Sequence, residues 1–342
     1  MLILKLKNFK SIDNIEFNLK NLNILTGLNS SGKSSIIQSM RMLHNASLKK
    51  DIYFDEIFGG FNELVCEFFQ DSKEISMELT GYGNLKVREN GFDNNITKEL
   101  QVIYIGANRV GPLRYAINAV NPDKYNPLGL DGEYCYQYIS QNGSENYSKF
   151  LEYSNFENNR TGETIALKHL IEDWIKKIAH VQSFNINQGS NGMEDITAMQ
   201  INRKYKATNV GYGIGYVLPV ITALIAFSGK KDTFILLENP EAHIHPKGQS
   251  ALGELIAKVA STGTKIILET HSDHIISSIR VATKYNLINH DDIGINFFRI
   301  VEKNTNVFVT ENTEINIDKD GRFDKYPEDF FDQFELNLER LL

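Results

Sequence analysis

The sequence predicts an α/β fold with a mixed central sheet, an N-terminal antiparallel β lobe and a helical lobe. Three patterns support this prediction. Leucines and lysines alternate over residues 4–7, which is typical of a half-buried strand. Apolar residues recur at helical spacing over residues 167–178, which indicates an amphipathic helix. Apolar strands alternate with helices over residues 233–280, and this order favours parallel pairing of the strands.

Length and composition are those of an ordinary globular chain. Its 342 residues suffice for one large domain or two intimate ones, and its net charge of −7 argues against non-specific coating of nucleic acid. Cys66 and Cys135 form neither a metal-type nor a redox-type pair, which favours a reducing compartment. The apolar N-terminus is interrupted too early for a signal peptide, and the longest apolar stretch, 217–227, is too short for a membrane span. We therefore expect a cytoplasmic protein with no membrane partner.

The first third of the chain is predicted to form strands around one helix. Alternating residues predict strands at 4–7 and 15–19, joined by a turn at Lys10–Asp13, and a buried strand follows at 22–26. Apolar residues at helical spacing begin after residue 34. Beyond a polar break at 49–51 and a turn at 59–61, further strands are expected at 63–69, 74–79, 85–88 and 101–105.

The stretch from Gly27 to Ser34 fits G-x-x-x-x-G-K-[ST], the phosphate-binding loop of nucleotide hydrolases. Its glycines let backbone N–H groups surround phosphate oxygens, and the helix that follows adds the positive partial charge of its N-terminus. Lys33 is expected to reach the β- and γ-phosphates of ATP, and Ser34 to ligate Mg²⁺. The alternative is a plain Gly/Ser turn between strand and helix. The predicted ATP-binding residues are Asn29, Ser30, Ser31, Gly32, Lys33, Ser34 and Ser35.

The middle of the chain has a different character. Residues 118–164 are rich in Asn, Gly, Ser and Tyr and contain two Asn-Pro turn formers, which indicates long loops with short helices. The amphipathic helix at 167–178 follows, and Trp174 within it is expected in the core. Residues 182–203 are polar, and no element is predicted there.

Four apolar residues and then Glu238 end the strand predicted at 233–237. In a chain with a phosphate loop, an acid at this place has the form of a Walker B strand and would hold the water shell of Mg²⁺. The next strand, 265–268, leads to His271. Because ligands gather at the carboxyl ends of parallel strands, the phosphate loop, Glu238 and His271 are predicted to lie at one edge of the sheet.

These motifs in combination resemble ABC-type ATPases of the SMC, RecF and OLD (overcoming-lysogenisation-defect) group. The resemblance rests on Asn8–Ile12, the phosphate loop, Glu238–Pro246 and Glu269–His274. More narrowly, the chain resembles small OLD-related bacterial ATPases that end in a short C-terminal domain of unknown function, whose motif is similar to Tyr326–Asp332. The resemblance covers essentially the whole chain. It implies an ATPase head that dimerises head to head, with ATP between one protomer's phosphate loop and the other's signature segment.

The resemblance assigns the trans signature to Gly211, Gly213 and Gly215, with a helix expected directly after Tyr216. A second helix N-terminus directed at the γ-phosphate suits this role. The family usually has Ser and Gln where this chain has Gly215 and Tyr216, so the hydroxyl contact to ATP is missing. The alternative is a Gly-rich bend that packs closely on a neighbouring segment.

The resemblance also implies four catalytic positions: Glu238, Asn239, Glu241 and His271. Glu238 would hold Mg²⁺, and His271 matches the switch histidine that contacts the γ-phosphate; the alternative for His271 is a structural position beside a helix cap. Many ABC-type ATPases have a glutamate where this chain has Asn239, which can orient water but cannot accept its proton. Glu241 is the nearest carboxylate and the expected base. Because losing a well-placed base costs about 10²–10⁴ in rate, slow hydrolysis is expected.

The function implied by the resemblance is a Mg²⁺-dependent ATPase that acts as a dimeric switch, as a homodimer or a higher even-numbered oligomer. Full-length OLD proteins carry a TOPRIM nuclease domain, and we expect none in the residues after 293. We therefore expect regulation or scaffolding of a separately encoded effector protein, in bacterial anti-phage defence or DNA maintenance. Arg109 matches a recurring family arginine and is expected at the nucleotide, at the dimer face or in a structural ion pair.

Three other interpretations stay open. DNA binding in the manner of RecF and SMC proteins, with DNA as a partner, would use the lysines between residues 5 and 10, which equally suit a solvated strand face. Metal-dependent hydrolysis would use the histidines between residues 243 and 274. A metal nuclease would use Asp318 and Asp320, where a turn is the simpler interpretation.

The sequence predicts four segments along the chain. Residues 1–117 hold the N-terminal β lobe and the phosphate loop, and residues 118–208 form a helical and loop insertion. Residues 209–292 hold the signature, the Walker B acid and the switch histidine. Residues 293–342 hold a strand pair, 293–300 with 306–310, and a short helix.

Overall fold

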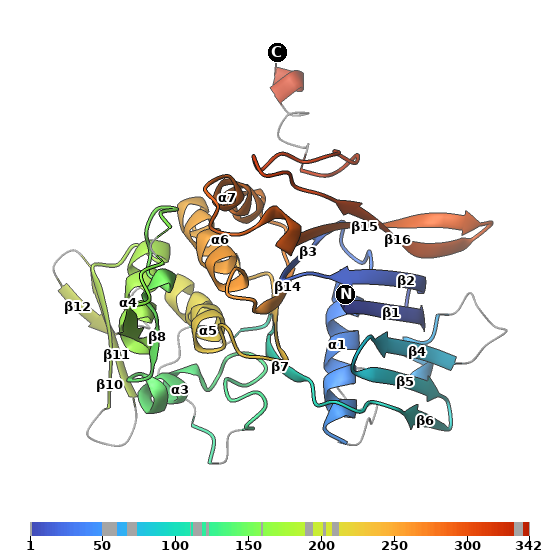
Figure 1. The fold of residues 1–342 in the computed structure, drawn as a ribbon, viewed down its shortest axis with the longest axis horizontal. Coiled ribbons are helices and arrows are strands. Elements are labelled where there is room, and N and C mark those ends of the chain that lie inside the picture. Colours follow the sequence, from blue (N-terminus) through green and yellow to red (C-terminus); the bar gives the residue numbers. More distant parts are fainter. Residues whose placement is uncertain are drawn as a thin grey trace. The chain divides into compact units, whose positions relative to one another are not determined.

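Figure 1 shows the chain as a ribbon coloured from the N-terminus to the C-terminus. The computed structural model describes residues 2–49, 60–66, 74–109, 111, 118–120, 123–158, 160–188, 194–200, 203–206, 212–331 and 338–341. The chain divides into two units, each described here by itself. The four-segment division stays a prediction. The first unit comprises Met1–Val102, Ile293–Asn316 and Phe323–Leu342, and the second unit comprises Ile103–Asp292 and Ile317–Arg322.

The first unit contains a five-stranded antiparallel sheet in the order β2-β1-β4-β5-β6 (Figure 1). The predicted period of two explains its core face, because Leu4 and Leu6 are fully buried while Lys7 is exposed. Leu6 lies opposite Ile15 of β2 and Met77 of β4, so three strands share one buried face. The bounds are β1 Leu2–Phe9, β2 Ile12–Leu19, β4 Glu74–Leu79, β5 Gly83–Arg88 and β6 Gly91–Asn94.

A mixed group of three strands carries the phosphate loop in the same unit. β3 (Leu22–Gly27) pairs in parallel with β15 (Ile293–Asn304), which pairs antiparallel with β16 (Val307–Ile315). α1 (Lys33–Ser47) follows the loop, buries its predicted apolar face and contacts β3, β4 and β5. The predicted order of strand, loop and helix is therefore confirmed. β16 continues beyond the residue 310 expected from the sequence.

The second unit combines parallel strands with helices. β13 (Thr233–Glu238) and β14 (Lys265–Glu269) pair in parallel, with Leu236 opposite Ile267, as the alternation of strands and helices predicted. α6 and α7 pack against each other, and α4 contacts both α5 and α6 (Figure 1). Trp174 of α4 is fully buried, as expected. The other large elements are α4 Leu167–Ile178, α5 Tyr212–Ala226, α6 Pro246–Ala260 and α7 Asp273–Lys284. The strand β7 (Gln101–Ile105) belongs to this unit from Ile103 onward.

Short elements fill the region where the sequence predicted loops and short helices. A three-stranded antiparallel sheet, β10-β11-β12, occupies the polar stretch for which no element was predicted. Phe184 and Ile186 alternate there with asparagines, a pattern too short to stand out from its polar surroundings. The bounds are α3 Cys135–Asn142, β8 Asn146–Ser148, η1 Lys149–Leu151, β9 Thr164–Ala166, β10 Ser183–Gln188, β11 Glu194–Gln200, β12 Arg203–Lys206 and η3 His290–Asp292.

Two predicted elements are wrong at their ends. The strand expected over 63–69 begins as a helical turn, α2 (Phe61–Leu64), because Phe61 and Leu64 are buried at a spacing of three; residues 67–69 lie outside the described residues. The helix expected after Tyr216 already begins at Tyr212. At the C-terminus, residues 338–341 are helical as expected. None of the helices in the described part of the chain is long and apolar enough to cross a membrane.

Candidate functional site

The phosphate loop joins β3 to α1 through backbone conformations that favour glycine. Gly27 has φ 125° and Gly32 has φ 101°, and Ser30 between them has φ 60°. A Cβ atom at Gly27 would lie 2.1 Å from the carbonyl oxygen of Phe298 on β15, so only glycine fits where β3 ends. The glycines of the motif are therefore required by the fold as well as by its predicted chemistry.

Lys33 is buried within the loop that it would serve. Its ammonium Nζ donates hydrogen bonds to the carbonyl oxygens of Gly27, at 3.0 Å, and of Leu28, at 2.6 Å. Its side chain is 3% exposed, whereas the following Ser34 is exposed. The loop therefore surrounds the ammonium of Lys33, and Ser34, whose hydroxyl is predicted to ligate Mg²⁺, lies at the surface of the loop.

The N-terminus of α1 has the features of an anion site. Gly32 is its N-cap without a side-chain cap, and its first turn contains no acidic residue. The hydroxyl Oγ of Ser31 is buried and has no hydrogen-bond partner among the described residues. The phosphates of a nucleotide fit this combination of backbone donors, a buried ammonium and an unsatisfied hydroxyl. The hydroxyl of Ser34 is of the oxygen type that Mg²⁺ prefers as a ligand.

Thr310 of β16 is hydrogen-bonded to this loop. The sequence analysis assigned no role to Thr310. Its hydroxyl Oγ1 donates to the carbonyl oxygen of Ser31 at 3.0 Å and lies 2.7 Å from the hydroxyl of Ser11. A Cβ atom at Gly32 would lie 2.5 Å from the same Oγ1 atom. The contact joins residues 279 positions apart, so no local pattern could have revealed it.

In the second unit, Glu238 ends β13 and lies opposite Glu269 of β14. The next residue, Asn239, has φ 44°, a left-handed conformation that asparagine tolerates better than glutamate. The backbone N–H of Asn239 donates to the carbonyl oxygen of Glu269 at 2.9 Å. This turn gives a structural reason for asparagine at the position where a glutamate is usual in the resembling family.

Arg109, in the segment after β7, fixes the same turn. Its guanidinium donates to the carbonyl oxygens of Gly106 at 2.9 Å, Glu238 at 2.8 Å and Asn239 at 2.7 Å. The side chain is 3% exposed, and burial lowers its pKa while the nearby carboxylate of Glu241 opposes this shift. Arg109 therefore holds the backbone at Glu238 and Asn239 through carbonyl groups and not through an ion pair, which was one of its three expected roles. The roles at the nucleotide and at the dimer face stay predictions.

Glu241 and His271 lie together. The carboxylate Oε1 of Glu241 accepts a hydrogen bond from the backbone N–H of His271 at 2.8 Å. Its Oε2 is buried and has no partner among the described residues. Burial raises the pKa of Glu241, and the hydrogen bond from His271 partly offsets this. Sequence reasoning named both residues but not the contact between them.

His271 precedes the N-cap of α7. The Ser272 hydroxyl accepts from the backbone N–H of Ile275 at 3.1 Å and donates to Gln249 of α6 at 2.6 Å. The backbone here is fixed, while His271 itself is exposed. An exposed side chain on a fixed backbone suits a ligand contact, and the neighbouring cap also matches the structural alternative.

The signature segment lies in and before α5. Gly211 lies outside the described residues, and Gly213 and Gly215 lie within the helix instead of before it. A Cβ atom at Gly213 would lie 3.2 Å from the carbonyl oxygen of His243, and the ring of Tyr216 lies 4.4 Å from that of His243 between centroids. The helix therefore packs closely on His243 at Gly213. The signature role of the glycines stays a prediction.

The histidines expected for a metal hydrolase have other contacts. His243 packs against Tyr216, and His245 is the N-cap of α6, where its side chain accepts from the backbone N–H of Lys247. Among the described residues, no three or more His, Cys, Asp or Glu side chains are grouped to hold a metal ion. The metal-hydrolase interpretation therefore gains no support.

The other two alternatives also gain no support. Asp318 accepts from the backbone N–H groups of Asp320 and Arg322, at 2.9 Å and 2.8 Å, which is the predicted turn. On β1, the ammonium of Lys5 lies 3.9 Å from carboxylate oxygens of both Glu16 and Glu78. Exposed pairs of this kind contribute little, and they match a solvated strand face.

Comparisons with known protein families agree with the motifs. Residues 133–276 match the AAA ATPase domain family, and residues 288–341 match a protein family of unknown function (DUF3696). The first match includes the turn from Glu238 to Glu241 and His271, and it begins after the phosphate loop. The comparison of the sequence with curated proteins gives no match.

Solved structures of Smc head domains share the fold, as two examples illustrate. The Smc head domain with an extended coiled coil bound to the C-terminal domain of ScpA, from Pyrococcus furiosus, is 12% identical, with a TM-score of 0.52 and 100% of both chains covered. The SmcHead bound to the C-winged helix domain of ScpA is 13% identical, with a TM-score of 0.51, covering 93% of this chain and 98% of that chain. The chain thus shares the fold of Smc head domains, and separate parts of it match the AAA ATPase domain family and the DUF3696 family.

Proposed function

We propose that this chain binds ATP with Mg²⁺ at the loop from Gly27 to Ser34, hydrolyses it slowly and uses the cycle as a dimeric switch. The observation that carries the proposal is the buried ammonium of Lys33, held by two loop carbonyls at the uncapped N-terminus of α1. A buried cation beside an uncapped helix N-terminus is strongly selective for an anion.

Binding would use donors that the loop already presents. Lys33 would exchange the carbonyl oxygens of Gly27 and Leu28 for phosphate oxygens, which are stronger acceptors for an ammonium. The Ser31 hydroxyl would gain the acceptor that it lacks among the described residues. Ser34 would ligate Mg²⁺ and Glu238 would hold its water shell, which would supply neutralisation of the phosphate charge. The remaining loop residues would donate backbone N–H groups.

Hydrolysis would use Glu241 as the base. Burial raises the pKa of this carboxyl, which brings it closer to the range in which a base works at neutral pH. The backbone N–H of His271 orients its Oε1 atom. The Asn239 side-chain oxygen, buried without a partner among the described residues, would orient the attacking water but could not accept a proton. Slow turnover follows, because the base does not directly follow the Walker B acid.

The dimer would complete the site through α5. The first-turn N–H groups of this helix, near Gly213 and Gly215, support contact with the γ-phosphate of a partner protomer, together with Gly211. We further propose a separately encoded effector as partner, in a cytoplasmic setting of bacterial anti-phage defence or DNA maintenance. The ScpA-bound Smc head is an example of this fold that carries a partner protein.

The test is ATP binding and turnover by the full chain and by Lys33→Ala. The loss of a charge-assisted contact is expected to weaken ATP binding at this site by about 1.5–3 kcal/mol, and to abolish turnover. Lys7→Ala, an exposed strand lysine of the same unit, is the control and should leave both unchanged. Unaltered affinity and turnover in Lys33→Ala would overturn the assignment.

The dimeric switch needs its own measurement. Light scattering with size-exclusion chromatography should report twice the monomer mass when ATP is added to a chain that cannot complete hydrolysis, Glu241→Gln. A chain that stays monomeric at saturating ATP and Mg²⁺ would contradict the dimer while leaving ATP binding intact.

A further inference from the structure

A cavity of about 550 Å³ lies in the second unit, beside the end of α4, the beginning of α6 and residues 153–156. We call it the α4–α6 cavity. Its volume is within the range of about 300–1,000 Å³ found for small-ligand sites. None of the residues in the predicted nucleotide site lines it.

Three lysines give the cavity a positive charge. Lys176 and Lys177 end α4, and Lys247 begins α6; none of them forms an ion pair with a described residue. The carboxylate that lines the cavity, Glu254, is 1% exposed and lies 3.4 Å from the ammonium of Lys258. The charge of Glu254 is therefore compensated by Lys258, which does not line the cavity. The excess charge of the three lysines favours an anionic ligand with more than one charge.

Lys247 stands where a cation is locally unfavourable. It occupies the first turn of α6, whose N-terminus carries positive partial charge, and this turn contains no acidic residue. Such a placement costs about 0.3–1 kcal/mol relative to a neutral residue. Lysines at the end of α4 are explained by the helix dipole, whereas Lys247 is not. An anion in the cavity would offset both the lysine and the helix N-terminus.

The backbone around the cavity is strained. Asn155 and Phe156 are consecutive residues with φ 49° and 67°, and His180 on the opposite segment has φ 54°. A left-handed conformation costs a residue with a bulky side chain about 1–2 kcal/mol. Strain of this kind is concentrated at ligand sites, where the surrounding fold holds it in place. Burial and the charges of Lys247 and His245 lower the pKa of His180, so the lysines supply the charge at neutral pH.

Two aromatic rings line the same space. Tyr153 is fixed edge-on against Trp174, with ring centroids 5.3 Å apart, and carries the Lys177 ammonium 5.0 Å from its own centroid. Phe156 stacks on Tyr285 at 6.3 Å with an interplanar angle of 20°. Fixed aromatic rings beside lysines suit a flat ring that carries phosphates.

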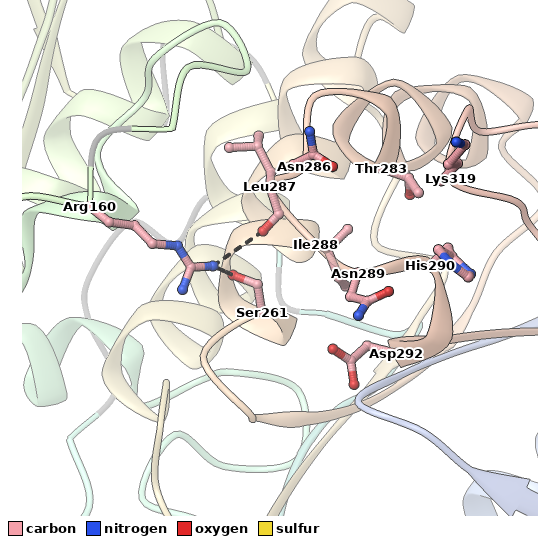
Figure 2. A pocket seen from close by; sticks show the side chains of 10 residues that line it. All are labelled: Arg160, Ser261, Thr283, Asn286, Leu287, Ile288, Asn289, His290, Asp292 and Lys319. Carbon is pink, nitrogen blue, oxygen red and sulfur yellow. Dashed lines mark hydrogen bonds between the residues drawn. The ribbon is translucent and has the colours of Figure 1, made fainter.

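A second cavity of the same unit also contains basic side chains, but they have different surroundings from the lysines of the α4–α6 cavity (Figure 2). It measures about 370 Å³, and its arginine is already engaged: Arg160 donates to the Ser261 hydroxyl at 3.1 Å and to the Leu287 carbonyl at 3.4 Å. His290, Asp292 and Lys319 also line this cavity. The arginine of this cavity therefore already binds protein groups, unlike the lysines of the α4–α6 cavity.

We propose that the α4–α6 cavity binds a second nucleotide, with its phosphates on Lys176, Lys177 and Lys247 and its base against Tyr153 or Phe156. This site is independent of the phosphate loop and of the function proposed for it. The ligand is a free mononucleotide; the terminal nucleotide of a single strand has the same chemistry and is the alternative source.

The experiment measures the number of ATP molecules bound per chain by equilibrium dialysis of the full-length protein. Wild type should bind two and Lys33→Ala one. The double variant Lys177→Glu with Lys247→Glu should also bind one, with affinity at the cavity lowered roughly tenfold or more per lysine. Both side chains are exposed, so the double variant should keep the thermal unfolding midpoint of wild type. Lys319→Glu, in the cavity of Figure 2, is the matched control and should bind two.

Each outcome decides between the two sites. One ATP in wild type and none in Lys33→Ala would overturn the cavity proposal and leave the phosphate loop intact. One ATP in the cavity double variant and two in Lys33→Ala would support the cavity and contradict the phosphate loop. A 5′-phosphorylated 12-nucleotide DNA strand is tested on Lys33→Ala in the same way. If this variant binds the DNA strand but does not bind ATP, the free-nucleotide assignment is overturned. Binding of ATP to both Lys33→Ala and the variant that combines all three substitutions would also overturn it.

Discussion

The phosphate loop and the turn from Glu238 to Glu241 both follow the end of a strand, yet the structure holds them in different ways. Backbone geometry holds the loop, since Gly27 and Gly32 adopt positive φ and a Cβ atom at either would clash. A buried side chain holds the turn, since Arg109 donates to the backbone carbonyls of Glu238 and of the following Asn239. Backbone geometry is encoded in adjacent residues, whereas a distant arginine is not. The loop is therefore visible as a motif, and the support of the turn is not.

Arg109→Met tests whether a buried side chain holds the turn. Of the substitutions discussed, it should lower the free energy of unfolding most. Three carbonyl oxygens would lose their charged donor in a buried place, at about 1–3 kcal/mol each where no water replaces it. We expect unfolding stability to fall by about 3 kcal/mol or more, measured by urea denaturation.

Two controls sharpen this test. Arg109→Lys keeps the charge but not the planar fork, so it should fall between wild type and Arg109→Met. Arg160→Met removes an exposed arginine that also caps a carbonyl and should cost well under about 1 kcal/mol. Equal losses in Arg109→Met and Arg160→Met would show that burial at the turn is not what makes Arg109 important.

The parts of the fold that the sequence predicted are those with strong local patterns. The alternation at Leu4 and Leu6, the motif around Lys33 and the apolar face of α4 all correspond to observed elements. The three-stranded sheet β10-β11-β12 was missed because its strands are largely polar, and α2 was mistaken for a strand because four residues carry little periodicity.

Gly27→Ala tests the backbone half of the comparison. Alanine would combine a φ of 125° with a Cβ atom 2.1 Å from a carbonyl oxygen of β15, which cannot move without disturbing the strand pair. Strain of about 1–2 kcal/mol and overpacking of about 1–3 kcal/mol should add, with a loss of ATP binding. Thermal unfolding and ATP affinity are the measurements.

Gly81→Ala is the matched control for that substitution. Gly81 also has a positive φ, 80°, but a Cβ atom there would meet nothing within 4 Å. It should therefore show the strain alone, about 1–2 kcal/mol, and normal ATP affinity. Should the two variants lose the same stability, the close approach of β15 to the loop would not matter.

The contacts of the candidate site depend on separations that sequence patterns do not carry. Thr310 reaches Ser31 across 279 positions and Arg109 reaches Glu238 across 129, so their roles emerge only in the folded chain. Asn239 is different, because its left-handed conformation is a local property. Asparagine directly before Pro240 indicated a turn there, and that signal could have explained the missing glutamate from the sequence alone.

Glu241→Gln should have the smallest effect on stability. It tests whether the folded chain shifts the pKa of Glu241, the carboxylate at the end of the turn from Glu238 to Glu241. Burial raises the pKa of Glu241 in the folded chain, so the folded state holds this proton more tightly than the unfolded state. Its contribution is therefore fully present below the ordinary pKa of a glutamate and is lost as pH rises through the raised pKa. Glutamine keeps an acceptor for the backbone N–H of His271 and has no charge to bury. The stability difference between variant and wild type should then grow in favour of the variant from about pH 4 upward and level off above the raised pKa, measured by urea denaturation across pH. A difference that is constant with pH would show that Glu241 titrates as it does in the unfolded chain, and the argument for Glu241 as a tuned base would fail with it.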